Sequence, residues 1–135
     1  MKAIFLGTSG SMPTAERSSS STVIKIGRDI VMFDCGEGTQ RQMVKARVGF
    51  RRDMIILISH LHGDHVLGLP GLLQSMSLLG REKQLEIFGP EGLIDYIKSF
   101  SETLGGSAFP VILYEIREPG VVHEETRFKI ISVPT

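Results

Sequence analysis

The sequence predicts an α/β fold in which helices cover a mixed sheet. Short runs rich in apolar and β-branched residues alternate along the chain with segments of helical periodicity. Residues 54–58 (MIILI) form an all-apolar run, which is typical of a strand covered on both faces. The length of 135 residues suits one domain with a single core. These three observations together favour one layered α/β unit.

The first half of the chain is dominated by strands. Strands are predicted at residues 2–7, 22–27, 30–34 and 54–58. The second and third of these strands are expected to form a hairpin about Gly27. A turn-rich segment with two Gly/Ser clusters connects the first strand to this hairpin, and a short helix is expected from residue 37 to about residue 45.

The second half alternates helices and strands. Apolar spacing predicts helices at residues 69–79 and 93–104, with Gly80 and Gly105-Gly106 as stop signals. Further strands are predicted at residues 85–88, 111–116 and 127–133. Because the last strand runs to the end of the chain without a cap or a polar tail, we expect the chain to continue in its parent protein.

Composition restricts the cellular setting more than the function. The chain has 15 basic and 15 acidic residues, so net charge gives no support for an RNA partner. No apolar run reaches the roughly 18 residues that a membrane span requires. The apolar run at the N-terminus is also too short for the core of a signal peptide. A single cysteine, Cys35, cannot form an internal disulfide. We therefore expect a cytoplasmic protein without a membrane partner.

The residues that carry chemistry are concentrated after the all-apolar strand. Three of the four histidines, His60, His62 and His65, lie within six residues together with Asp64. Ligands in α/β folds gather at the carboxyl edge of the sheet, and imidazole and carboxylate groups are good zinc ligands. Two ions about 3.5–4 Å apart would clamp the attacking and leaving oxygens of a displacement. The isolated His123 is predicted to be structural or exposed rather than a ligand.

Several motifs carry a family resemblance. The segment His60-Leu61-His62-Gly63-Asp64-His65 matches the HxHxDH signature of the metallo-β-lactamase superfamily. The opening FLGTSGSMP, the DCGEGTQ segment that begins at Asp34 and the FGP turn followed by Gly92 resemble ribonuclease Z, as does PTAERS (residues 13–18) in place of a PxKxRN loop. The resemblance runs along essentially all 135 residues. It implies that residues 1–135 are the N-terminal half of an αββα sandwich whose second half is absent.

The resemblance also implies roles for individual residues. His60 and His62 would bind one zinc ion, and Asp64 with His65 would bind the other, for two ions in the complete site. Asp64 would additionally act as general base or acid around the attacking water. Asp34 would anchor the metal loop through hydrogen bonds without touching the metal.

Substrate contacts are expected outside the metal loop. Pro13 and Arg17 keep the family pattern of the loop associated with the tRNA 3′ end, whereas Ala15 and Ser18 replace its Lys and Asn. The loss of the Lys removes a cation that could meet phosphate. Cys35 is interpreted as small buried packing rather than as a nucleophile.

The leading functional hypothesis is a zinc-dependent endoribonuclease that removes the 3′ trailer of precursor tRNA and forms a homodimer. The family places its remaining ligands beyond this segment, so we expect the isolated chain to be inactive or weakly active. An alternative with the same fold is a phosphodiesterase or arylsulfatase-like hydrolase of small molecules. A third interpretation is a metal-binding half-domain that dimerises through its open sheet face.

Overall fold

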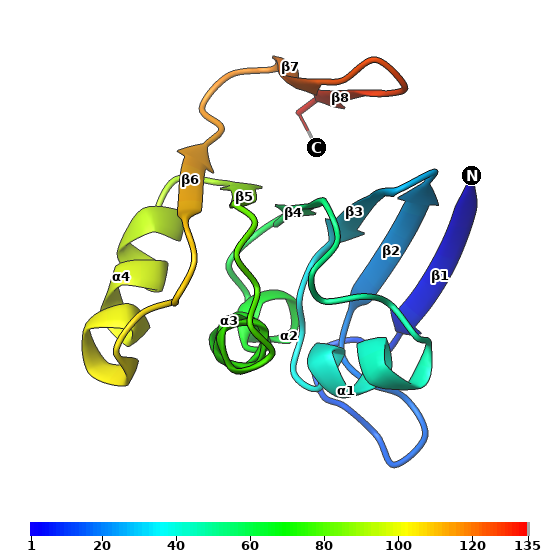
Figure 1. The fold of residues 1–135 in the computed structure, drawn as a ribbon, viewed down its shortest axis with the longest axis vertical. Helices are drawn as coiled ribbons and strands as arrows, with labels where there is room; N and C mark the ends of the chain where they lie inside the picture. Colours follow the sequence, from blue (N-terminus) through cyan, green and yellow to red (C-terminus); the bar gives the residue numbers. More distant parts are fainter. Residues whose placement is uncertain (135) are drawn as a thin grey trace.

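The computed structural model describes residues 1–134, which form one six-stranded sheet, four helices and a separate hairpin (Figure 1). The sheet strands are β1 (Lys2–Gly7), β2 (Ser21–Ile26), β3 (Asp29–Phe33), β4 (Met54–Leu57), β5 (Leu85–Gly89) and β6 (Val111–Glu115). They lie side by side in chain order. The first three strands pair antiparallel, and the pairs from β3 to β6 are parallel. The predicted mixed sheet is therefore confirmed.

All the helices lie on one face of this sheet, below it in Figure 1. They are α1 (Thr39–Lys45), α2 (Gly63–Val66), α3 (Leu69–Leu78) and α4 (Leu93–Leu104). The main core lies between these helices and the sheet, where Ile56, Leu72 and Ile87 are fully buried. Burial of such side chains stabilises the fold by roughly 1.5–3 kcal/mol each relative to exposure.

The other face of the sheet is covered by a hairpin of β7 (Gly120–Glu124) and β8 (Lys129–Ser132), above the sheet in Figure 1. A smaller cluster forms here, in which Val31, Leu57 and Phe88 of the sheet are buried against side chains of the hairpin. Val121 and Ile131 of the hairpin remain more than half exposed. Because both faces of β4 are covered, all four of its residues are buried, as the all-apolar run predicted.

Most predicted elements are confirmed to within one or two residues, and two elements were missed. Helix 93–104 has the predicted bounds, with left-handed glycines at both ends. Strand β7 was not predicted, because its second half is the polar pair His123-Glu124, and the last strand is shorter than predicted. The four-residue helix α2 was not predicted, since it is too short to show periodicity.

None of the helices in residues 1–134 is long and apolar enough to cross a lipid bilayer.

Candidate metal centre

The histidine loop follows the buried strand β4 and enters helix α2. Ile58 still donates its backbone N–H to Phe88 of β5 at 2.8 Å, so the loop leaves the sheet at a fixed point. His62 then adopts an extended conformation and precedes the first residue of α2. Asp64 and His65 lie within α2 itself. A short helix thus returns these two side chains toward the histidines that precede it.

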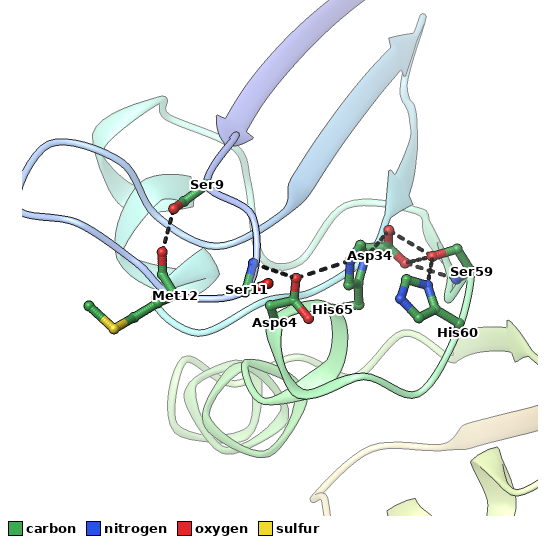
Figure 2. Close-up of polar contacts among 8 residues, drawn as sticks. All are labelled: Ser9, Ser11, Met12, Asp34, Ser59, His60, Asp64 and His65. Atoms are coloured by element: carbon green, nitrogen blue, oxygen red, sulfur yellow. Dashed lines mark hydrogen bonds and ion pairs between the residues drawn. The ribbon is translucent and has the colours of Figure 1, made fainter.

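The three imidazoles of the loop lie close together. The ring centroids of His60 and His62 are 4.6 Å apart, and those of His60 and His65 are 4.0 Å apart. The Nε2 atom of His65 lies 3.3 Å from Oδ2 of Asp64. The structure therefore brings together all four residues that the sequence singled out as candidate ligands (Figure 2 draws three of them).

Asp34 braces this group from the neighbouring strand (Figure 2). It follows β3 in a left-handed conformation with φ of 58° and is buried. Its Oδ2 lies 2.7 Å from Nδ1 of His65, and its Oδ1 accepts hydrogen bonds from the backbone N–H and hydroxyl of Ser59 at 2.8 and 2.9 Å. Since a carboxylate can only accept, Nδ1 of His65 carries the proton. Nε2 of His65 is then free to act as a ligand.

Ser59 extends the brace to a second histidine. Its hydroxyl oxygen lies 2.9 Å from Nδ1 of His60. Because the single hydroxyl proton of Ser59 points to Asp34, Nδ1 of His60 donates to Ser59, which again leaves Nε2 as the available atom. One buried carboxylate therefore sets the tautomer of two imidazoles. Sequence reasoning missed Ser59, and the signal was only a hydroxyl residue between the apolar strand and His60.

Asp64 is held by the long loop that follows β1. The backbone N–H of Ser11 donates to Oδ2 of Asp64 at 2.9 Å (Figure 2). This hydrogen bond, together with the nearby His65 and His60, lowers the pKa of the Asp64 carboxyl. Asp64 is therefore ionised at neutral pH, as a metal ligand must be. Sequence reasoning did not identify Ser11, because 53 positions separate it from its partner.

Close backbone approach fixes the segment that follows Asp34. A Cβ on Gly36 would lie 2.3 Å from the backbone oxygen of Asp64, so only glycine fits between β3 and α2. Cys35 is completely buried beside it, and this burial raises the pKa of its thiol to about 12. A thiol in this state is not a nucleophile at neutral pH.

The other predicted residues lie apart from the histidines. Pro13 and Arg17 line a cleft against α1 whose lining includes none of the four candidate ligands. His123 lies on the opposite face of the sheet, in the hairpin. Its ring stacks on Phe128, with centroids 5.8 Å apart, and Nδ1 lies 3.5 Å from Glu86. The structure places His123 far from the metal loop in a packed position.

The donors of the histidine loop fit zinc in type and in tautomer. Imidazole Nε2 atoms and an ionised carboxylate are the ligands that zinc takes in hydrolytic sites. The ligand set is incomplete, because within residues 1–134 no three His, Cys, Asp or Glu side chains converge on a point that an ion could occupy. A tetrahedral ion at this position would require further ligands or a small movement of the loop.

A mixed sheet with helices on one face and a histidine-rich loop at the carboxyl end of a buried strand defines the metallo-β-lactamase class of fold. A family model described as Anti-Pycsar protein Apyc1 matches residues 1–124. The chain belongs to this family.

Two relatives and two solved structures are informative. The chain is 47% identical to ribonuclease Z of Methanocaldococcus jannaschii over all of its length and 44% of that protein. It is 42% identical to ribonuclease Z of Synechocystis over 96% of this chain and 41% of that protein. The short form of human tRNase Z matches with a TM-score of 0.78 and 39% identity over 85% of this chain and 45% of that one.

A metallo-β-lactamase fold protein of Bacillus subtilis matches with a TM-score of 0.66 at 22% identity, over 87% of this chain and 48% of that one, and supports the fold alone. The matches confirm the predicted fold class and the predicted resemblance to ribonuclease Z. The chain nevertheless spans less than half the length of the ribonuclease Z relatives it matches.

Proposed function

We propose that this chain is the N-terminal half of a zinc-dependent endoribonuclease that hydrolyses the phosphodiester at the 3′ end of precursor tRNA. The observation that carries the proposal is that three histidines and Asp64 lie close together on one loop, with Asp34 setting the tautomer of two of the imidazoles. Similarity to ribonuclease Z over the whole chain supports the substrate class. The single, buried Cys35 supports a reducing, cytoplasmic setting.

Four residues would hold the metal. His60 and His62 would bind one zinc ion, and Asp64 with His65 would bind a second, for two ions in the complete site. Zinc, when bound, supplies Lewis acidity and lowers the pKa of bound water to about 7.

Residues of this chain orient the imidazole rings and can accept a proton from water. Asp34 holds the proton on Nδ1 of His65 and, through Ser59, the proton on Nδ1 of His60, so neither ring can rotate without breaking a hydrogen bond. Asp64 is kept ionised by the N–H of Ser11 and can accept a proton from water. Pro13 and Arg17 would contact the substrate from the loop that also carries Ser11.

The isolated chain should cleave poorly. The four donors are too few to surround two ions, and the ribonuclease Z relatives are more than twice as long as this chain. We infer that residues 1–135 form one half of the catalytic domain and that the remaining ligands lie in a second half.

The test is cleavage of a precursor tRNA that carries a 3′ trailer, with the end of the product mapped. The zinc-loaded chain is assayed alone and after fusion to the remaining portion of the Methanocaldococcus jannaschii ribonuclease Z. We expect a weak or absent cut by the chain alone and a cut after the discriminator nucleotide by the fusion. The same fusion with His62→Ala is the control and should be inactive.

A fusion that folds and binds zinc but leaves the trailer intact would contradict the tRNA assignment. If that fusion hydrolyses a chromogenic phosphodiester instead, the small-molecule diesterase becomes the better description of the site.

We also propose that the protein is a homodimer. Val44 of α1 and Leu78 and Leu79 at the end of α3 are exposed by 65%, 87% and 53% and line a groove of about 350 Å³. Exposed apolar side chains gathered in this way are typical of an interface. We expect sedimentation equilibrium to give twice the chain mass, and Leu78→Asp to give the monomer mass.

A further inference from the structure

A second polar feature of the chain lies apart from the histidine loop. A cleft of about 290 Å³ separates the loop of residues 13–18 from helix α1. Three cationic side chains line it: Arg17 from the loop, and Arg41 and Lys45 from α1. In the part of the chain that the structure describes, none of the three forms an ion pair, although Glu16 and Glu37 line the same cleft.

These three cations share one cleft, whereas some other surface cations are neutralised by a carboxylate. Lys83 lies 2.8 Å from Asp53, and Lys129 lies 2.9 Å from Glu124. Because they line one cleft, these cations repel one another, although Glu16 and Glu37 offset part of their charge. An anion bound among them would relieve this repulsion.

Hydrogen bonds fix the conformation of the loop and its position against α1. The hydroxyl oxygen of Thr14 accepts the backbone N–H of Arg17 at 2.9 Å, and the backbone N–H of Thr14 donates to the Arg17 carbonyl at 2.8 Å. Gln42 of α1 donates from Nε2 to the hydroxyl of Ser18 at 2.9 Å. The loop is therefore folded on itself and tied to α1, beside which it lies in Figure 1.

The loop also connects the cleft to the metal centre. Ser11, two residues before the start of the cleft-lining segment, donates to Asp64 of α2. Ala15 of the same loop lines the cleft but carries no charge. Two of the three cations in the lining, Arg41 and Lys45, come from α1.

We propose that this cleft binds a backbone phosphate of a single-stranded polynucleotide, with Arg41 and Lys45 of α1 as its principal contacts. The inference rests on the proposed function and deepens it, because it names where, apart from the histidine loop, the substrate strand is held. The contact is to phosphate and not to a base, so it contributes affinity without sequence preference.

The test is binding of a short fluorescein-labelled single-stranded RNA to the zinc-free 135-residue chain, followed by fluorescence anisotropy at several salt concentrations. For the double variant Arg41→Gln/Lys45→Gln we expect affinity to fall about tenfold or more at low salt. The slope of log affinity against log salt should fall by about 0.7, the value for one lost phosphate contact on a single strand.

Two further variants make the result specific. Arg28→Gln/Lys98→Gln removes the same charge from the exposed β2–β3 turn and from α4, and should leave the affinity within about twofold of wild type. Ala15→Lys adds a cation to the cleft and should raise the affinity. Because this variant predicts a gain, a folding defect cannot imitate the expected result.

Equal loss in the two double variants, or wild-type affinity in Arg41→Gln/Lys45→Gln, would overturn the proposal. Titration with inorganic phosphate separates the two sources of the anion: a cleft that binds phosphate but not RNA, with the same dependence on Arg41 and Lys45, would also overturn it. RNA binding that depends on the cleft, together with no cleavage of precursor tRNA by the fusion protein, would retain this inference and reject the proposed function.

Discussion

The two ends of the parallel strands are both polar, but they differ in how their charges are used. At the amino end, Asp29 pairs with Arg127 and Asp53 pairs with Lys83. Asp29, Asp53 and Arg127 line a cavity of about 510 Å³. At the carboxyl end, Asp34 pairs with no Lys or Arg and instead orients imidazoles.

The cavity at the amino end is lined by none of the four candidate ligands. Carboxylates at the amino end are satisfied by opposite charges on the surface, which contribute about 0.2–1 kcal/mol each. At the carboxyl end, the Nδ1 atoms of His60 and His65 form hydrogen bonds with Ser59 and Asp34. Neither of these hydrogen bonds involves an Nε2 atom. The ring nitrogens that could bind a metal therefore lie at the carboxyl end.

The largest expected difference between the two ends is in thiol reactivity. Burial raises the pKa of Cys35, which follows Asp34, to about 12, so at pH 8 its thiolate population is about a thousandfold below that of an ordinary thiol. We expect no reaction of the native chain with a disulfide reagent at pH 8, and full reaction in denaturant. Gln84→Cys, placed in the open cavity at the amino end in a Cys35→Ser background, should react at once. Rapid reaction of native Cys35 would show that the carboxyl end is not packed as described.

The second-largest expected difference between the two ends is in the effect of removing a histidine on zinc affinity. For His60→Ala we expect zinc affinity to fall by more than the roughly 10–100-fold that loss of an outer partner costs, because a ligand is lost. His123→Ala, at the hairpin face, should leave zinc affinity unchanged. Competition with a chromophoric chelator measures both, and a larger effect from His123→Ala would reverse the assignment.

Matched carboxylate substitutions sharpen the comparison further. Asp34→Asn keeps the shape of the side chain but no longer requires a proton on Nδ1 of His65, so we expect zinc affinity to fall about 10–100-fold. Asp29→Asn at the amino end should leave the affinity unaltered. The same chelator competition measures this pair, and equal affinities for Asp34→Asn and wild type would remove Asp34 from the site.

The smallest expected effect is at the ion pair between Asp53 and Lys83. The hydrogen bond from Lys83 lowers the pKa of Asp53 in the folded chain. The pair therefore stabilises the fold above the ordinary carboxyl pKa of 3.8, and this contribution is lost as the pH falls through the lowered value. For Lys83→Ala we expect a loss of about 0.2–1 kcal/mol in urea unfolding at pH 7 and a smaller loss in acid. A loss that grows in acid would contradict this sign.

The sequence could predict the candidate ligands because they are local. His60, His62, Asp64 and His65 fall in one short motif after an apolar run, and the carboxyl end of such a strand is where ligands gather. The parallel strands and α4 were also predictable, since their apolar patterns are long and clear.

The contacts that orient the ligands were not predictable in the same way. The bond from Ser11 to Asp64 spans 53 positions, and those from Asp34 to Ser59 and His65 span 25 and 31. Such pairs depend on how strands and loops meet in three dimensions, which no local pattern records. The hairpin strand β7 was missed for a related reason: its polar half has no strand pattern of its own, and His123 there packs edge-on against Phe88 of the sheet, with ring centroids 5.9 Å apart.

The most direct measurement is an anomalous difference map at the zinc absorption edge from crystals of the chain grown with zinc. The account predicts a peak about 2.0–2.1 Å from Nε2 of a histidine in the His60–His65 loop, with Asp34 still on Nδ1 of His65. A peak at the amino end, between His123 and Glu86, with none at the histidine loop would contradict the account.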